Sequence, residues 1–226
     1  MTIRPAPPPQ TPPVYDALAP HYDRSLRPLE RLLLRRLRAD ALRALASDNS
    51  NIARSSGFIN SSSSGGDGRR LLEIGAGTGL NFAHYPRDAH GAATEPSREM
   101  IRRAREKSRP VGVCLVQNSA EALPFADDSF DAALATLVFC SLASPQQAFA
   151  ELRRVVRAGG RIVLLEHVRP AGLLGYLFDA LSLFTERLFE DHFNRRTAAE
   201  ARRAGLRLLR IERHALGIVQ LIVCEV

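Results

Sequence analysis

The chain has 226 residues, of which 45% are hydrophobic and 24% are charged, and its formal net charge is +7. This length and composition suit one globular domain with its own hydrophobic core, and they exclude a peptide-sized scaffold. Because no run of about 18 apolar residues exists and residues 1–10 lack the layout of a secretory signal, we expect a cytoplasmic protein without a membrane span. The three cysteines are widely spaced and include no Cys-x-x-Cys pair, so we predict neither a disulfide framework nor a metal site.

Arginine supplies almost all of the positive charge, because Lys107 is the only lysine. A basic surface can indicate nucleic acid or anionic lipid as a partner. Arg31, Arg35 and Arg38 share one predicted helix, without the interleaved aromatic residues that a base-stacking surface requires. We therefore interpret them as an ordinary solvated helix face and expect no nucleic acid partner.

Three segments precede the main domain. Six of the first 13 residues are proline, which predicts a disordered tail. Residues 14–46 have a helical pattern with leucines opposite arginines. Residues 47–68 are rich in serine and glycine, which predicts a flexible linker before a domain at 69–226. The helical stripe consists of Leu29, Leu32, Leu33, Leu37 and Leu45.

Seven short apolar runs alternate with helical stretches along the rest of the chain. This alternation predicts an α/β fold, a Rossmann-like doubly wound seven-stranded sheet, mostly parallel, with helices on both faces. About four residues around Gly217 join the last two runs, too few for a helical crossover, so these two strands must be antiparallel. The predicted strands are Arg70–Ile74, Ala92–Glu95, Val111–Val116, Phe130–Ala135, Arg161–Glu166, Leu206–Arg213 and Ile218–Val226.

A glycine-rich turn follows the first predicted strand. Gly75, Gly77 and Gly79 alternate after Glu73 and precede a predicted helix start. The simplest interpretation is a tight strand-to-helix turn, but glycines also let a backbone approach a ligand closely. The next strand ends at Glu95, whose carboxylate can accept both hydroxyls of a ribose. A dinucleotide loop would need a glycine at position 80, where the chain has Leu80, so a nucleoside without a diphosphate is favoured.

The Glu-x-Gly-x-Gly-x-Gly pattern resembles the S-adenosyl-L-methionine loop of class I methyltransferases, and the resemblance extends from Leu71 to Val226. Asn118–Asp131 is similar to the adenine-side loop of that family. The resemblance implies S-adenosyl-L-methionine as cofactor and S-adenosyl-L-homocysteine as product, with Glu73 near the methionine ammonium group and Glu95 on the ribose. The implied cofactor-binding residues are Tyr15, Tyr22, Glu73, Gly75, Ala76, Gly77, Thr78, Gly79, Asn81, Glu95, Pro96, Met100, Ser119, Ala120, Glu121, Thr136 and Leu137.

Other segments bear on the methyl acceptor. Thr136–Leu142, Glu151–Val156 and Leu165–Arg169 resemble the membrane-associated alkyl thiol methyltransferases, as does His192–Thr197. Tyr15–Asp23 is similar to the lid helix of quinone and phospholipid methyltransferases, which implies that residues 14–46 form an N-terminal helical lid. These resemblances imply a small hydrophobic acceptor, with a thiol as first choice and a quinone ring carbon or a phospholipid amine as alternatives.

Three histidines are candidates for a catalytic role on the acceptor side: His167, His192 and His21. Each can equally be a structural hydrogen-bonding residue. The apolar segment 171–189 fits an acceptor pocket, contact of a peripheral protein with a membrane, or core packing. A rival of another class is a non-catalytic module that uses the same fold to bind lipid or RNA. The sequence does not predict an oligomeric state.

Overall fold

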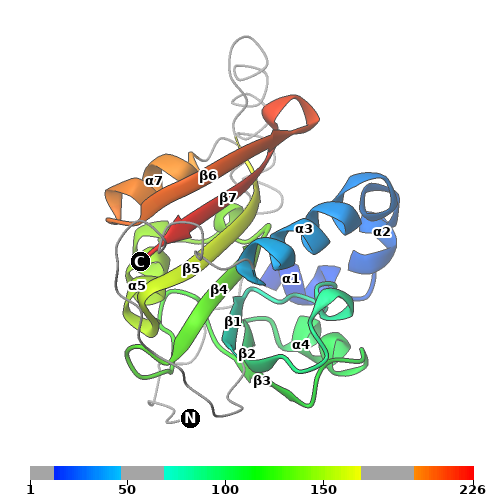
Figure 1. The fold of residues 1–226 in the computed structure, drawn as a ribbon. Coiled ribbons are helices and arrows are strands. Elements are labelled where there is room, and N and C mark those ends of the chain that lie inside the picture. Colours follow the sequence, from blue (N-terminus) through cyan, green and yellow to red (C-terminus); the bar gives the residue numbers. More distant parts are fainter. Residues whose placement is uncertain (1–12, 47–68, 169–195) are drawn as a thin grey trace.

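A seven-stranded sheet forms the centre of the protein in the computed structural model, which describes residues 13–46, 69–168 and 196–226 (Figure 1). The strand order is β3-β2-β1-β4-β5-β7-β6. Strands β1 to β5 pair in parallel, whereas β7 is antiparallel to both β5 and β6, as the sequence predicted. The strands are β1 Arg70–Ile74, β2 His90–Glu95, β3 Gly112–Gln117, β4 Phe130–Thr136, β5 Val156–His167, β6 Arg207–His214 and β7 Val219–Glu225.

Both faces of the sheet are covered by helices. Along β5, Ile162 and Leu164 belong to the hydrophobic core on one face, and Val163 and Leu165 to the core on the other. The alternating side chains are all buried, which explains why this strand reads as a continuous apolar run. Helices α5 and α7 cover one face, and α3 and α4 the other. The helices are α1 Pro13–Leu18, α2 Tyr22–Leu29, the π-helix η1 Glu30–Leu34, α3 Arg35–Ala46, the 3-10 helix η4 Phe82–His84, α4 Arg98–Arg105, the 3-10 helix η5 Phe139–Ser141, α5 Pro145–Val155, α7 Thr197–Arg203 and the 3-10 helix η6 Ala215–Gly217.

The N-terminal helices pack against the main domain. Helix α3 contacts β4, β5 and β7, and the Arg161 guanidinium donates a hydrogen bond to the Ala44 carbonyl across 3.0 Å. The predicted leucine stripe is buried at Leu37 and Leu45, but Leu29 is 43% exposed and Leu32 is 85% exposed. A π-turn changes the helical register, so one stripe of three-to-four spacing cannot stay on a single face across η1.

One of the predicted helical stretches, the one after the glycine turn, is absent. The chain after the glycine turn forms turns and the short η4 rather than an α-helix, because Pro86 favours an extended Tyr85, with ψ of 141°. Residues 118–129, all of them described, connect β3 to β4 without a helix. Both connections therefore return from the carboxyl edge of the sheet to its amino edge without an α-helix.

Several sequence-based expectations concern residues outside the described ranges. These are the proline-rich tail, the serine-glycine linker, the apolar segment 171–189 and His192. Within the described residues, no helix has the length and apolar character needed to cross a bilayer. The same residues contain no group of three side chains suited to hold a metal ion.

Candidate functional site

A cavity of about 480 Å³ opens at the carboxyl ends of β1, β2, β3 and β4. This is the edge at which open α/β sheets bind ligands. Most of the predicted cofactor-binding residues line it, and they come from the N-terminal helices, the glycine turn and the loops after β2, β3 and β4. They are Tyr15, Tyr22, Gly75, Ala76, Gly77, Thr78, Glu95, Pro96, Met100, Ser119, Ala120, Glu121, Thr136 and Leu137.

The glycine turn forms one wall of the cavity. Gly75 and Gly77 have φ angles of +62° and +56°, a region that residues with a Cβ rarely adopt. A Cβ on Gly75 would lie 2.5 Å from Cγ2 of Val138, whereas a Cβ on Gly77 would meet no atom within 4 Å. Gly75 thus allows the turn to pack against the β4 loop, and Gly77 leaves space on the cavity side.

Glu95 lies at the end of β2 with both carboxylate oxygens held by the backbone. Oε2 accepts the N–H of Gly77 across 2.8 Å, and Oε1 accepts the N–H of Ser97 across 2.9 Å. Burial raises the pKa of Glu95 to about 7, although the two N–H bonds oppose the shift. Each carboxylate oxygen has a second lone pair, so the group can still accept hydrogen bonds from a ligand.

Glu73 and Asn81 do not line the cavity, contrary to the sequence-based expectation. The Glu73 carboxylate accepts a hydrogen bond from Asn81 Nδ2 across 2.6 Å and another from the Tyr85 hydroxyl. Glu73 is fully buried, and burial raises the pKa of its carboxyl group. Gly79 is also outside the lining, because the ring of Phe82 packs against it. Glu73 is therefore buried beneath the cavity and is not part of its described lining.

Arg38 lines the cavity, a placement that the sequence analysis missed. Its guanidinium Nη1 donates to Asn81 Oδ1 across 2.9 Å and to Thr136 Oγ1 across 2.8 Å. Its Nε donates to Glu30 Oε1 across 2.9 Å. The predicted solvated arginine is only 4% exposed, because it lies on the buried face of α3 with Leu37, Ala41 and Leu42. Its spacing of three to four residues from the buried Leu34, Ala41 and Leu42 is a sequence signal that could have revealed it.

Polar contacts join helices α1 and α2 to the cavity walls. Asp16 accepts hydrogen bonds from the Ser97 hydroxyl and from the N–H of Glu99. Asp23 accepts one from the Thr78 hydroxyl and pairs with Lys107 Nζ across 2.6 Å. The Lys107 ammonium group also donates to the Thr78 carbonyl across 2.7 Å. These contacts hold Tyr15 and Tyr22 over the cavity.

The loop after β4 forms the opposite wall. Leu137 has a φ of +58°, a strained value for a residue with a Cβ. Glu166 Oε1 stabilises this turn by accepting the N–H groups of Val138 and Phe139 across 3.0 and 3.2 Å. Beside it, the Glu121 carboxylate accepts hydrogen bonds from the Ser119 hydroxyl and the Ser144 N–H. The remaining lining residues are Leu80, Val138, Ser141, Leu142 and Ala143.

The predicted catalytic histidines do not meet at the cavity. His167 lies at the end of β5 and His21 at the start of α2, where it is exposed, and neither lines the cavity. His192 is outside the described residues. Among the described lining residues, the ionisable side chains are Tyr15, Tyr22, Arg38, Glu95 and Glu121. The described part of the site therefore offers shape and charge but no histidine base.

A parallel sheet with a glycine turn after β1 and an acid at the end of β2 is the arrangement of class I methyltransferases. Residues 72–164 match a family model described as "Methyltransferase domain". A solved S-adenosylmethionine-dependent methyltransferase from Thermotoga maritima has the same fold, with a TM-score of 0.62 at 22% identity, covering 94% of this chain and 97% of that one. Residues 72–164 are therefore similar to a methyltransferase domain, and the chain shares its fold with a solved methyltransferase.

Curated relatives divide among three kinds of methyl acceptor. A phosphatidylethanolamine N-methyltransferase of Cereibacter sphaeroides is 35% identical over 54% of this chain and 62% of its own length. A thiol S-methyltransferase of Homo sapiens is 32% identical over 48% and 47%. A ubiquinone/menaquinone biosynthesis C-methyltransferase of Vibrio parahaemolyticus is 33% identical over 51% and 48%. The chain thus spans about half to three fifths of the length of these relatives.

Proposed function

We propose that this protein transfers a methyl group from S-adenosyl-L-methionine to a small hydrophobic acceptor, with a thiol as first choice. The observation that carries the proposal is the cavity of about 480 Å³ between the glycine turn and the β4 loop, with the Glu95 carboxylate in its wall. The space beside Gly77, where an added Cβ would meet no atom, fits a ligand in close contact with the backbone.

The cavity residues follow the strand order, which suggests how the cofactor would be held. Ser119, Ala120 and Glu121 follow β3 and would contact the adenine, and Glu95 at the end of β2 would accept the ribose hydroxyls. Arg38 lies at the far end, beside Thr136 of β4. Its guanidinium would pair with the carboxylate of the amino-acid end, because charge-assisted hydrogen bonds to carboxylates are strong. This role replaces the expected contact of Glu73 with the cofactor.

When bound, the cofactor supplies an electrophilic methyl group on a sulfonium centre. The residues of this chain would orient the reactants and exclude water, since in-line transfer depends chiefly on alignment. Tyr15 and Tyr22 would close the cavity from the N-terminal side, and Leu137 and Val138 would present apolar surface to the acceptor. A thiol, with a pKa near 8 to 9, already supplies some thiolate at neutral pH and needs little help from a base.

The described lining residues include no histidine, which favours this soft nucleophile over a carbon acid. The thiol and phospholipid methyltransferases among the relatives support a thiol and a phospholipid amine respectively, and a quinone carbon stays a third candidate. A lipid-soluble acceptor would also agree with the peripheral membrane contact expected from the sequence. A non-catalytic lipid- or RNA-binding module stays the rival of another class.

Two measurements test the proposal. Saturating S-adenosyl-L-homocysteine should raise the unfolding temperature, because a ligand that binds only the native state stabilises it. Labelled S-adenosyl-L-methionine should then be incubated with alkyl thiols, quinols and phosphatidylethanolamine in parallel. Label in the thiol is expected. An unchanged unfolding temperature would contradict the proposal that the protein binds this cofactor. Label found only in the lipid would show that the acceptor is a phospholipid amine rather than a thiol.

A further inference from the structure

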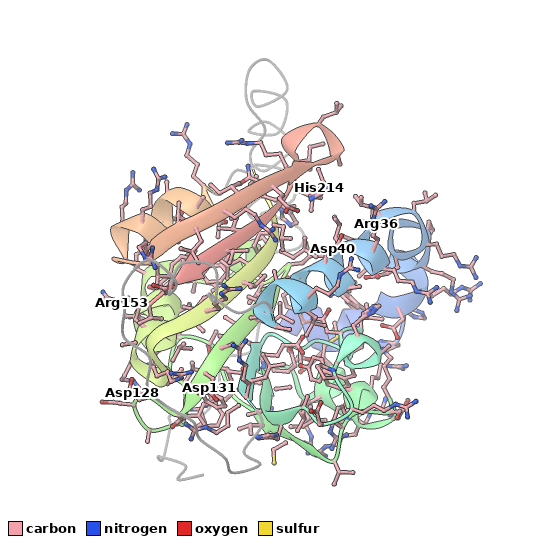
Figure 2. All side chains as sticks on the ribbon, in the orientation of Figure 1. Arg36, Asp40, Asp128, Asp131, Arg153 and His214 are labelled. Atoms are coloured by element: carbon pink, nitrogen blue, oxygen red, sulfur yellow. The ribbon has the colours of Figure 1, made fainter. Side chains whose placement is uncertain are left out.

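The outer surface of residues 22–36 combines exposed leucines with exposed arginines. Leu32 is 85% exposed and Leu29 is 43% exposed, although both are aliphatic. We name this area the lid surface. Its arginines, all exposed, are Arg24, Arg27, Arg31, Arg35 and Arg36. Arg36, labelled in Figure 2, lies on the side of α3 that points away from α1 and α4.

The positive charge of the lid surface is not neutralised within the described part of the chain. Residues 22–36 contain two acids, and both are engaged elsewhere, Asp23 with Thr78 and Lys107, and Glu30 with Arg38. Among the described residues, no carboxylate lies within ion-pairing distance of the five arginines of the lid surface. The surface thus presents an unbalanced cationic patch around two aliphatic side chains.

An anionic lipid bilayer complements both features. Its headgroups attract guanidinium groups, and its acyl region takes up aliphatic side chains that water solvates poorly. A nucleic acid would satisfy the charge but would give the leucines no partner, and the described lid surface has no exposed aromatic side chain on which bases could stack. We propose that the lid surface docks on an anionic phospholipid membrane, with Leu29 and Leu32 inserted below the headgroups.

The same segment connects this surface to the cavity. Tyr22 and Arg38 line the cavity, and the helical run between them carries Leu29 and Leu32. Docking would therefore bring the cavity close to the bilayer, where a hydrophobic acceptor is concentrated. The docking itself does not depend on bound cofactor, so it can be tested separately from methyl transfer.

The experiment is flotation of the full chain with vesicles of phosphatidylcholine alone or of phosphatidylcholine mixed with phosphatidylglycerol. We expect binding only to the mixed vesicles, with loss at high salt. Arg27→Gln with Arg31→Gln should weaken binding about 30-fold. The matched control, Arg202→Gln with Arg203→Gln, removes two exposed charges from α7 on the other side of the molecule and should have little effect (Figure 1).

A second pair of variants tests the contribution of the apolar side chains to vesicle binding. Leu29→Ser with Leu32→Ser should weaken vesicle binding by more than about tenfold. Val111→Ser with Leu216→Ser, at exposed positions outside the lid surface, should leave binding unchanged. All variants should keep the unfolding temperature shift with S-adenosyl-L-homocysteine, which shows that they fold.

Three results would overturn the proposal. They are equal binding to neutral vesicles, full vesicle binding by the Leu29→Ser, Leu32→Ser variant, and binding of polyuridylate that depends on Arg27 and Arg31 while vesicle binding does not. Absence of vesicle binding with a normal S-adenosyl-L-homocysteine shift would overturn the docking alone. Absence of the shift with normal vesicle binding would instead overturn the proposed function.

Discussion

Arg38 and Thr136 are separated by 98 residues in sequence, and the Arg38 guanidinium donates to the Thr136 hydroxyl across 2.8 Å. One residue belongs to an N-terminal helix and the other ends the central strand β4. Asn81 joins them, donating to Thr136 Oγ1 across 2.9 Å and accepting from Arg38. This buried junction fixes the N-terminal helices at the amino-acid end of the proposed cofactor cavity.

Replacing Arg38 tests this junction. Arg38→Gln removes the positive charge at the cavity. We expect the free energy of S-adenosyl-L-homocysteine binding, measured by calorimetry, to become less favourable by roughly 1.5 to 3 kcal/mol. Arg36→Gln removes an exposed arginine from the same helix and should bind normally. Equal affinities for the two variants would show that Arg38 is not a cofactor contact.

Glu95→Ala removes the proposed ribose acceptor. Because the carboxylate makes charge-assisted hydrogen bonds, cofactor binding should weaken by roughly 1.5 to 3 kcal/mol. The measured dissociation constant of S-adenosyl-L-homocysteine should therefore increase. If that constant does not change, Glu95 has no role in ribose binding.

The raised pKa of Glu95 predicts pH dependence with opposite signs for binding and for stability. Its pKa is about 7 in the folded protein, against an ordinary value of 4.5. Ribose hydroxyls donate to the ionised form, so cofactor affinity should rise roughly tenfold from pH 6 to pH 8. Between pH 4.5 and 7 the folded state holds a proton that the unfolded chain releases. The Glu95 contribution to the unfolding free energy should therefore fall by about 3 kcal/mol across that window.

Glu95→Gln is the control for this titration. It keeps the shape of the side chain but cannot ionise, so both pH dependences should flatten. The measurements are binding isotherms and chemical unfolding at matched pH values. A variant with the original pH profile would assign the titration to another group.

Two glycines of the same turn should respond differently to alanine. Gly75→Ala adds backbone strain and forces a Cβ against Val138, which should cost about 3 kcal/mol of unfolding free energy. Gly77→Ala adds only the strain, about 1 to 2 kcal/mol, but its methyl group enters the cavity. Thermal unfolding should rank Gly75→Ala as the less stable variant. A fully retained cofactor affinity in Gly77→Ala would contradict the placement of the cofactor there.

Lys107 should hold helix α2 to the glycine turn. Lys107→Met removes its contacts with Asp23 and Thr78, and because these groups are partly exposed the cost should not exceed about 1 kcal/mol. The backbone amides of α1 and α2 should then exchange hydrogen faster without ligand. Arg102→Met, in an exposed ion pair on α4, is the matched control. If the amides of α1 and α2 exchange hydrogen at the same rate in both variants, Lys107 does not hold these helices against the glycine turn.

Local sequence signals predicted the glycine turn and most of the strands well, but β5 begins at Val156 rather than at the predicted Arg161. Strands β1 and β4 are buried on both faces, so their mostly apolar residues marked them within one residue of their ends. The antiparallel pairing of β6 and β7 followed from a connection too short to cross the sheet. Glu95 reaches the cavity because the end of β2 lies beside the end of β1 in any such sheet.

The placements that the sequence did not predict depend on side-chain hydrogen bonds, some between residues eight to twelve positions apart and some between residues much farther apart. Glu73 was expected at the cavity, but Asn81 and Tyr85 enclose its carboxylate. Arg38 was expected in solvent, but it lies on the buried face of α3 and donates hydrogen bonds to Asn81 and Thr136. His167 lies at the predicted strand end, yet it is not part of the cavity lining.

By itself, the sequence determined the order of elements, the parallel sheet and the glycine turn, because hydrophobic period and glycine conformation are properties of a few neighbouring residues. Only the tertiary structure decided which polar side chains face the cavity. That choice depends on burial and on hydrogen-bond partners brought from far along the chain, such as Thr136 for Arg38, and no local pattern encodes those distances.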